Sequence, residues 1–571
     1  MVDIGVAKRQ QLGTWWTPKA DDLKVAEEIV SGNLTLDPHP SWFFNGEISW
    51  NADPFQQQNW RFQLHSMKWL DPLRRVALSD DRFRKQYGDA WYDTVRDWCK
   101  HNLETEDDFA WMDMADGLRA ITFTLGAALV PESEFEWFTD VIKFHEDRLR
   151  DKSRRVSGNH GLHQIQGLFV VASFLGNKQV QEEAVRDLTA LFEDEFDAQG
   201  TNLEGSLAYH DLNYHWWNLA AQRVQAEGIP CPEVSSRLQT SRGNLAHFVR
   251  PDGYLETIGD TPPGRPLSDD DLETTKFARS RGSEGMPPEK KSISLDAGYA
   301  AGRSEWGRTP CQFRDSSFYT LRWGTEAIHG HDDASSVTVF SKGVPWIVDP
   351  GMFAYQRGKE RRYFKGRSAH NLLIAEERDP DATGAVLTGH SSTEDGESYV
   401  VTSNAYDGYV LERRVIYLRE FDALVISDSA RDSKEIDPNS TLNFHQLWHF
   451  HPKTEVRVGM RTVTLVNDGA HLSMRWLKRP RFDLVGGVED PMQGWYSPHY
   501  GEKEASSVLE VFPTRRGDQS WLTVISLGEY EIFPIDISEV AGDISLKCEI
   551  DDASVKVVSK RTGEFTLAEG Q

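Results

Sequence analysis

The change of hydrophobic period near residue 250 constrains the fold of this chain more than any other feature. Before it, apolar residues recur every three or four positions, which is the spacing of one buried helix face. The pattern predicts helices over 65–78, 90–103, 109–129, 133–150, 160–175, 179–197, 204–225 and 233–249. Because the connections are short, consecutive helices should run antiparallel. An incomplete (α/α) toroid is the natural closed form of such a chain.

After about residue 300, short runs of β-branched and aromatic residues alternate with turn signals. They predict strands over 318–323, 336–340, 344–348, 399–404, 423–428, 454–458 and 462–466. No strong helical pattern interrupts them, so this half should form an antiparallel β-sandwich. The stretch between the two halves is polar and rich in Pro, Gly and charge. The predicted fold class is therefore α+β multidomain, with an N-terminal toroid over 1–260, a linker or long surface loop over 261–298 and a C-terminal sandwich over 299–571.

Composition narrows the possible partners. A net charge of −26 argues against nucleic acid and anionic membrane surfaces, because like charges repel at long range. No apolar run approaches the ~18–20 residues that span a bilayer. The N-terminus lacks the pattern of a secretory signal, so we expect either a cytoplasmic protein or a sequence from which a leader has been removed. Four widely spaced cysteines without a CxxC pair argue against a disulfide framework and a thiolate metal site. No pattern fixes an oligomeric state.

Three polar clusters interrupt the helical half of the chain. They are the Asn-His pair 159–160, the segment EGSLAYH at 204–210 and the loop PDGYLETIGD at 251–260. Each has an ordinary explanation, since Asn159 could cap a helix and Tyr209 could be a core or rim residue. Alternating helix directions, however, bring all three clusters to the same end of the helical layer. We interpret this end as one rim of a cleft.

The densest polar chemistry of the strand half begins at the motif His329-Gly-His331. If this motif is extended, its two imidazoles share one face. Two histidines with a nearby carboxylate, such as Asp349, are good ligands for zinc. A third histidine could come from the segment NFHQLWHFHP at 443–452. The sequence thus predicts a bound divalent metal in the β-domain.

Residues 357–367, called the basic segment below, reverse the charge of the chain locally. They hold six basic side chains against one acidic residue, Glu360. The six are Arg357, Lys359, Arg361, Arg362, Lys365 and Arg367. Such a run can be a solvated loop or a bridge to acidic residues of the helical domain. It also suits an electrostatic funnel for an anionic polymer.

With these motifs the sequence resembles the heparinase II/III-like polysaccharide lyases. The matching segments are NHGLHQIQGLFVVASF (159–174), EGSLAYH (204–210), PDGYLETIGD (251–260), HGHDDASSVTVFSKGVPWIVDPGMFAY (329–355) and RRYFKGRSAHN (361–371). They occur in the family's order, and the resemblance covers most of residues 150–460. It implies an (α/α) toroid followed by an antiparallel β-sandwich. It also implies cleavage of a uronate-containing polysaccharide or oligosaccharide by β-elimination.

The resemblance further implies roles for individual residues. Asn159 and His160 would bind and neutralise the uronate carboxylate, and Tyr209 and His329 would handle the protons as base and acid. Which of the latter two is the base depends on the configuration of the uronate. Donors to the developing aci-carboxylate lower the barrier to removing the C5 proton. Contacts to the anionic substrate are expected from Glu204, His210, Arg357, Arg361, Arg362 and His370.

The resemblance also implies a bound zinc ion. We expect its role to be structural, because a lyase does not need an activated water. Its ligands would be His331, Asp349 and a histidine of the segment 443–452. We choose His449, which precedes the Phe-His-Pro end of a strand, and His445 is the alternative.

Two other functions compete with the lyase interpretation. (α/α) Toroids also support glycoside hydrolases, which need two carboxylates across a cleft. Residues on the predicted rim that could supply them are Glu204, Asp211, Glu256 and Asp260. The second alternative is a polysaccharide-binding protein without turnover. The combination of Asn, His and Tyr with a basic segment favours uronate elimination over both.

Overall fold

The structure of the chain is a computed structural model, and it describes residues 2–105, 109–267, 272–307, 309–376, 378–433, 442–513, 519–551 and 553–569. The chain forms two compact units. Unit 1 comprises residues 1–195 and 213–238, and unit 2 comprises residues 196–212 and 239–571. Each unit is described by itself below. In the part of the chain that the structure describes, no helix combines the length and the apolar character needed to cross a bilayer.

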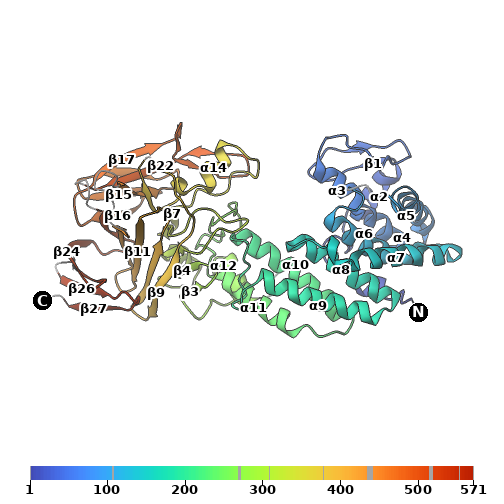
Figure 1. Cartoon of the computed structure of the whole chain (residues 1–571), viewed down its shortest axis with the longest axis horizontal. Coiled ribbons are helices and arrows are strands. Elements are labelled where there is room, and N and C mark those ends of the chain that lie inside the picture. Colours follow the sequence, from blue (N-terminus) through green and yellow to red (C-terminus); the bar gives the residue numbers. More distant parts are fainter. Residues whose placement is uncertain are drawn as a thin grey trace. The chain divides into compact units, whose positions relative to one another are not determined.

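Unit 1 is built from helices, which run from blue to green in Figure 1. They are α1 (Val6–Arg9), α2 (Asp22–Val30), α3 (Gln58–Ser66), α4 (Asp71–Ser79), α5 (Asp81–Asn102), α6 (Asp113–Leu125), α7 (Phe135–Arg150), α8 (Gly158–Leu175) and α9 (Lys178–Glu195). Helices α10 (Leu207–Ala226) and α11 (Pro232–Ala246) belong partly to each unit. A two-stranded pair, β1 (Asn33–Leu34) and β2 (Trp42–Phe43), completes the unit.

Helix α8 is the buried centre of unit 1. Every residue from Gly161 to Phe174 is buried, so this helix has no solvent face over most of its length. It packs closely against α6, where a Cβ on Gly167 would lie 2.6 Å from Gly117 Cα. The helix ends at Gly176, whose φ of 69° supplies the left-handed cap that the sequence predicted. The predicted helix 65–78 is instead divided, because Met67 takes a φ of 58°.

Unit 2 consists mainly of antiparallel sheets. The first sheet has the order β3 (Ser292–Leu295), β4 (Tyr299–Arg303), β5 (Phe318–Arg322), β6 (Val337–Ser341) and β7 (Val344–Ile347). The largest has the order β14 (Glu455–Val458), β15 (Thr462–Asn467), β16 (Ala470–Trp476), β23 (Ser520–Ser526), β12 (Ala423–Asp432), β11 (Tyr409–Leu418), β10 (Gly396–Ser403) and β9 (Val386–Thr393). A four-stranded sheet has the order β17 (Arg481–Gly486), β22 (Ser507–Phe512), β13 (Phe444–His449) and β8 (Leu373–Ala375).

The remaining elements of unit 2 are smaller. The chain ends in a sheet of β24 (Ile532–Val540), β25 (Asp543–Ile550), β26 (Ala553–Ser559) and β27 (Phe565–Glu569). Two short strand pairs are β18 (Val488–Glu489) with β19 (Met492–Gln493) and β20 (Trp495–Tyr496) with β21 (Glu504–Ala505). Its short helices are α12 (Glu273–Arg279), α13 (Pro310–Asp315) and α14 (Lys359–Lys365). One hydrophobic core, which includes the fully buried Trp346 and Trp448, joins residues of the first three sheets.

The predicted fold class is confirmed, since an N-terminal helical domain of the toroid type precedes an antiparallel β-sandwich. In its described residues, 261–267 and 272–298, the segment predicted as a linker or long surface loop contains a helix and a strand. Its helix α12 buries Phe277 and Ala278 in a cluster with Trp306 and Phe313. The strand β3 in the same segment pairs with β4. The sequence pattern did not indicate this packing, because few of the described residues of the segment are buried.

Buried histidines make the fold sensitive to acid. Burial, the main cause, lowers the pKa of His145, His163, His247 and His449 to about 3. Each imidazole is neutral when folded, but it binds a proton near pH ~6.5 when unfolded. Each buried histidine therefore adds its full contribution to the free energy of unfolding above pH ~6.5. This contribution is lost as the pH falls toward the pKa of the folded state, by at most about 1.4 kcal/mol per pH unit for each histidine.

We therefore expect the melting temperature to fall steadily between about pH 6.5 and pH 5, before most carboxylates titrate. His145→Gln should make this fall shallower, because one titrating group is removed. His499→Gln, at an exposed position, is the control and should leave the slope unchanged. Thermal scans by circular dichroism measure all three, and a melting temperature that does not vary over this range would contradict the expectation.

Candidate active site

Three segments of unit 2 meet at one point and carry most of the predicted site residues. They are 203–210 at the start of α10, 257–261 in the loop after α11, and 327–331 before β6. The His329 amide donates to the Glu204 carbonyl at 2.8 Å, and the Asp260 amide donates to the His329 carbonyl at 2.8 Å. The structure thus unites two of the predicted helical clusters with the predicted strand cluster.

Glycines make this close approach possible. Gly205 has a φ of 85°, and a Cβ there would lie 2.6 Å from Ala327 Cβ. Gly259 has a φ of 61°, and a Cβ there would lie 2.3 Å from the Gly205 carbonyl oxygen and 2.7 Å from that of His329. Side chains larger than hydrogen would push the three segments apart, since the neighbours are mostly backbone atoms. These contacts explain the glycines of the EGS and IGD motifs.

Asp260 lies at the centre of the site and is only 1% exposed. Its Oδ2 lies 3.1 Å from His329 Nδ1, and its Oδ1 lies 3.0 Å from His331 Nε2. Arg361 adds a bidentate pair, with Nη1 at 2.5 Å from Oδ1 and Nη2 at 2.7 Å from Oδ2. Burial alone would raise the pKa of Asp260, but these hydrogen bonds from the two histidines and Arg361 hold it well below its usual value.

Tyr209 and His329 form the second feature of the site. Their rings are stacked, with centroids 3.4 Å apart and planes 9° from parallel. The Tyr209 hydroxyl lies 2.9 Å from the Tyr355 hydroxyl. Burial is the largest cause and raises the pKa of Tyr209. The hydrogen bond with Tyr355 opposes this effect, and the Glu204 and Asp260 carboxylates raise the pKa further, so it lies above its usual value. The resting site therefore keeps the Tyr209 phenol protonated.

Tyr355 is a site residue that the sequence interpretation missed. Partial burial, together with the hydrogen bond that its hydroxyl shares with Tyr209, holds the pKa of Tyr355 far above its usual value. Its backbone amide contacts the Tyr500 hydroxyl at 3.3 Å, and Arg361 lies 5.6 Å from its ring centroid. The available signals were its place at the end of the family-like segment 329–355 and its position two residues before the basic segment.

A buried group of His331, Asp349 and His370 could hold a metal ion. One ligand atom of each residue lies within 4.8 Å of the others. The residues are 6%, 2% and 0% exposed, respectively. Among the described residues, neither His331 Nδ1 nor His370 Nε2 has a hydrogen-bond partner, although both atoms are buried. Two imidazole nitrogens without partners beside a carboxylate are a donor set that fits zinc.

This geometry corrects the predicted third ligand and the predicted role of His370. His370, expected to contact substrate, is fully buried, and its Nδ1 lies 2.8 Å from Asp349 Oδ2. His449, the predicted ligand, is outside the group. Its Nδ1 lies 3.3 Å from Asn371 Oδ1, and its Nε2 lies 3.3 Å from Gln493 Oε1.

The two other candidates for the third ligand also lie elsewhere. The alternative ligand His445 stacks on the Phe512 ring at 4.6 Å. His451 packs edge-on against Tyr496.

His210 is also not a substrate contact. It is 4% exposed, and its Nδ1 accepts from the Asn202 amide at 3.2 Å. Its Nε2 lies 3.0 Å from the Ser241 carbonyl. The two ring nitrogens thus link the backbone before α10 to the backbone of α11. Glu204, by contrast, faces the site, with its Oε2 at 3.9 Å from His329 Nε2.

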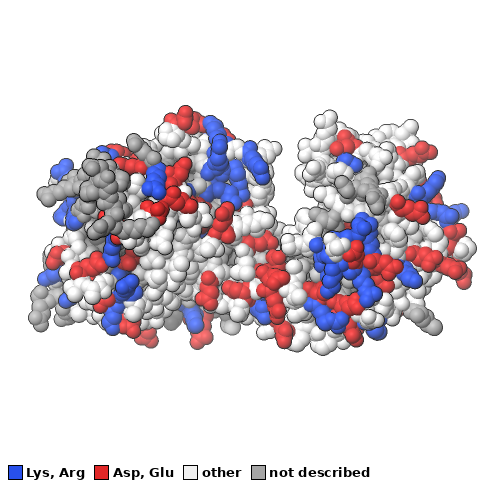
Figure 2. All heavy atoms as spheres, in the orientation of Figure 1, with Lys and Arg blue, Asp and Glu red and all other residues white. Residues whose placement is uncertain are grey.

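The basic segment borders this cluster. Arg357, Arg361, Arg362 and Lys365 line a cavity of about 590 Å³ together with His331. Figure 2 shows Lys and Arg side chains gathered over α14, the helix within this segment. Lys359 pairs with Glu489 and Arg367 with Asp332, so these two are engaged in the structure. Within the described ranges, Arg357, Arg362 and Lys365 form no ion pair.

Asn159 and His160 belong to the first turn of α8 in unit 1 and are partly exposed. The residue at the N-cap position is Ser157, so helix capping does not explain Asn159. The roles of Asn159 and His160 at the carboxylate stay predictions.

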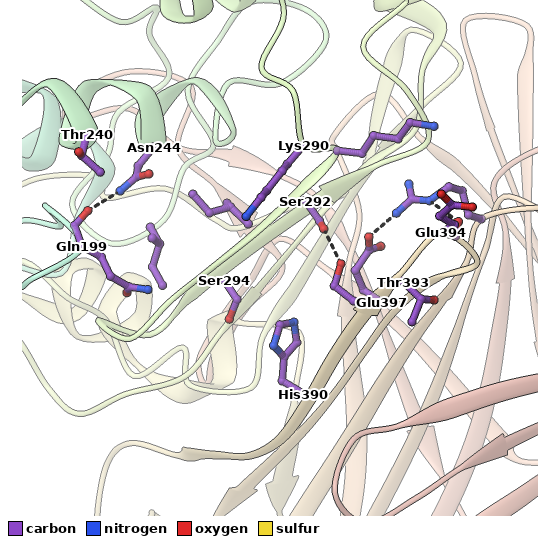
Figure 3. Close-up of a pocket in the computed structure, with 15 residues that line it drawn as sticks. Gln199, Thr240, Asn244, Lys290, Ser292, Ser294, His390, Thr393, Glu394 and Glu397 are labelled. Carbon is purple, nitrogen blue, oxygen red and sulfur yellow. Dashed lines mark hydrogen bonds and ion pairs between the residues drawn. The ribbon is translucent and has the colours of Figure 1, made fainter.

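A larger hollow of unit 2, of about 980 Å³, contains none of the predicted site residues. Figure 3 shows that its polar side chains contact one another. Ser292 Oγ lies 3.3 Å from Ser392 Oγ, and the Glu397 carboxylate pairs with Arg419. Glu397 also accepts from the Tyr319 hydroxyl at 3.0 Å. Glu397 is therefore a buried carboxylate whose hydrogen bonds hold strands together.

Comparisons with known proteins agree with this architecture. The family model described as "Heparinase II/III N-terminus" matches residues 19–238, and "Heparinase II/III-like, C-terminal" matches residues 297–532. The heparan sulfate lyase structure from Pedobacter heparinus has a TM-score of 0.74 at 18% identity, covering 98% of this chain and 91% of that one. A chondroitin AC lyase structure from Streptomyces coelicolor A3 has a TM-score of 0.58 at 10% identity, covering 98% and 92%.

Fold and site together define a protein with a helical toroid-type domain and a β-sandwich that carries a His, Tyr and Asp cluster. The chain belongs to the heparinase II/III-like family. At the sequence level it is similar to the heparin-sulfate lyase of Pedobacter heparinus, with 21% identity over 92% of this chain and 82% of the relative. The heparin-sulfate lyase of Bacteroides stercoris is also 21% identical, over 92% and 83%.

The glycine contacts can be tested with a matched pair of variants. Gly259→Ala should lower the stability of the fold markedly, because the new Cβ meets two backbone oxygens. Gly469→Ala is the control, since Gly469 has a φ of 77° but a Cβ there would have no neighbour within 4 Å. The control should cost only about 1 kcal/mol, from the left-handed backbone. Urea denaturation compares the two, and equal losses would contradict the steric explanation.

Proposed function

We propose that this chain cleaves a uronate-containing polysaccharide or oligosaccharide by β-elimination and leaves an unsaturated uronate end. Its class is that of its heparin-sulfate lyase relatives, a carbon–oxygen lyase that acts on polysaccharides. The observation that carries the proposal is the stacked pair of Tyr209 and His329, with the His329 ring held by Asp260. The pair offers a protonated phenol beside an imidazole, which is what elimination across a C5–H and a C4–O bond requires.

The reaction balances without water or any external reagent. The bond between C5 and its hydrogen breaks as His329 Nε2 takes the proton, and its electron pair forms the C4–C5 double bond. The C4–O bond breaks, and the Tyr209 hydroxyl gives its proton to the departing oxygen. A proton then returns from His329 to Tyr209, whose rings are stacked, and both groups are restored. The raised pKa of Tyr209 favours the phenol as the acid of the pair.

The uronate carboxylate must be bound and its charge offset during this step. Asn159 and His160 are the residues that we propose for this task, on the family resemblance alone. Donors to the developing aci-carboxylate stabilise the transition state more than the ground state.

Binding of an anionic chain is supported by the basic segment. Its cavity holds Arg357, Arg362 and Lys365 without ion pairs in the described part of the chain, so their charge is available to a ligand. In a chain of net charge −26 these side chains provide a local field that attracts an anionic polymer. Guanidinium groups also suit bidentate contacts to carboxylate or sulfate oxygens.

We further propose a zinc ion held by His331, Asp349 and His370. A bound zinc ion would brace the loops that carry these residues and would supply no step of the elimination. The buried nitrogens of His331 and His370 that have no partner among the described residues support this proposal. Asp349 already accepts from the Gly351 amide at 3.1 Å, which fixes the carboxylate in place.

Most of the carboxylates that a glycoside hydrolase would use already form ion pairs or hydrogen bonds with other groups of the protein. Asp211 pairs with Arg242, and Asp260 is held by two histidines and Arg361. Glu256 is 3% exposed, and its Oε1 accepts from the Thr257 amide at 3.0 Å. Glu204 alone of these four faces His329 Nε2. A hydrolase mechanism, which needs a carboxylic acid and a second carboxylate on opposite sides of the substrate, is therefore less well supported than elimination by the Tyr209–His329 pair.

Loss of the proton-transfer pair should abolish the reaction. Tyr209→Phe and His329→Ala should each reduce kcat by at least about 100-fold, because each removes one proton-transfer group. The measurement is the ultraviolet absorbance of unsaturated products from a panel of uronate polymers. Tyr530→Phe and His471→Ala change the same residue types at exposed positions and should retain wild-type rates.

Other products would reject the proposal. New reducing ends without an absorbance gain would indicate hydrolysis, and binding with neither signal would indicate a protein without turnover.

The zinc site gives a separate test of the metal proposal. His331→Ala and His370→Ala should each lower the zinc content of the purified protein and its melting temperature, because each removes a ligand. His449→Ala should leave the zinc content unchanged, since His449 lies outside the ligand group. Metal analysis by mass spectrometry measures all three. Wild-type protein purified with zinc but containing none would contradict the proposed site.

A further inference from the structure

Asp260 has more hydrogen-bond partners than a residue that only links two strands would need. Its Oδ1 contacts His331 Nε2 and Arg361 Nη1, and its Oδ2 contacts His329 Nδ1 and Arg361 Nη2. The side chain is buried, so these are its contacts in place of water. The two histidines belong to different groups, since His329 stacks on Tyr209 and His331 is part of the proposed zinc site.

The chemistry of a carboxylate fixes what each imidazole must do. An ionised carboxylate only accepts hydrogen bonds, and the bidentate contact with Arg361 requires the ionised form. His329 must therefore carry a hydrogen on Nδ1, and His331 must carry one on Nε2. The lone pair of His329 is then on Nε2, and that of His331 is on Nδ1. His331 Nδ1 is the buried atom without a partner among the described residues.

We propose that Asp260 is a positioning residue that sets the tautomers of His329 and His331 together. The inference rests on the proposed function for its His329 half and on the proposed metal site for its His331 half. One carboxylate thereby leaves a basic nitrogen on His329 for the C5 proton and a ligand nitrogen on His331 for zinc. Arg361 offsets the charge of Asp260 through its bidentate contact.

Asparagine at position 260 is nearly the same size as aspartate but cannot accept hydrogen bonds from both histidines. Its amide has one acceptor oxygen and one NH2 donor. The NH2 group would face either His329 or His331, and in both positions it would also face a donor nitrogen of Arg361. One histidine would therefore lose its bond or change tautomer in either orientation. An accepting carboxylate behind a catalytic histidine is worth a factor of about 10⁴ in kcat where it has been removed in this way.

The experiment measures kcat, KM and zinc affinity of the full chain with Asp260→Asn. We expect kcat to fall by at least about 100-fold while KM changes by less than about threefold, because the lost group acts on the base and not on the substrate. Zinc affinity, measured with the metal alone by competition with a chelator, should weaken by about 10- to 100-fold. Asp260→Glu keeps two acceptor oxygens and should recover part of both losses.

Glu397→Gln is the matched control, because Glu397 is a buried carboxylate with an arginine partner away from the site residues. It should change melting temperature but neither kcat nor zinc affinity. A double variant tests whether Asp260 affects kcat through His329. In a His329→Ala background, Asp260→Asn should reduce the residual kcat by less than about threefold.

Wild-type values of either kcat or zinc affinity in Asp260→Asn would overturn the proposal. An equal loss of kcat and of zinc affinity in Glu397→Gln would also overturn the proposal, because the losses would then reflect a general destabilisation of the fold. If wild-type protein forms no unsaturated product, the proposed function fails. The zinc measurement alone then decides the inference about Asp260.

Discussion

The geometry of the site depends on one buried carboxylate, Asp260, that accepts hydrogen bonds from His329, His331 and Arg361. A buried charge is costly unless its partners satisfy it, and here a bidentate guanidinium and two imidazoles do so. The same contacts join the loop after α11, the loop before β6 and the helix α14. Asp260 therefore contacts one residue of the proposed proton-transfer pair, His329, and one residue of the proposed zinc group, His331.

Close backbone packing complements this centre. Gly205 and Gly259 let the segments carrying Glu204, Asp260 and His329 approach to distances that a Cβ would forbid. Hydrogen bonds between their main chains then fix the approach. Tyr209 lies in the first turn of α10, four residues after Gly205, and its ring stacks on that of His329. Close backbone packing of this kind can hold the two proposed proton-transfer groups in contact.

Much of this could be predicted from the sequence, because local patterns carry it. Helical and strand periods indicated the order of the two domains, and the glycine-containing motifs marked the loops that meet. The family resemblance added Tyr209 and His329, and the structure brings both together with Glu204. Long-range pairings were less accessible. Nothing near His370 in the sequence indicates that its side chain is buried beside Asp349, which makes it a candidate for the proposed metal group and not for a substrate contact.

The errors have physical causes of the same kind. His449 follows a strand pattern that suits a ligand, but the buried Asn371 lies against its Nδ1. The segment 261–298 is polar on average, yet α12 places Phe277 and Ala278 in a buried hydrophobic cluster. Asp260 is a plausible hydrolase carboxylate by sequence, because the sequence cannot reveal that Arg361, 101 residues later, neutralises it.

A crystal structure of Tyr209→Phe with an uncleaved uronate oligosaccharide would test the central claim most directly. The account predicts that C5 of one uronate lies about 3–3.5 Å from His329 Nε2, with His329 Nδ1 still bonded to Asp260. A sugar acid bound away from His329, or a His329 ring turned away from Asp260, would contradict it.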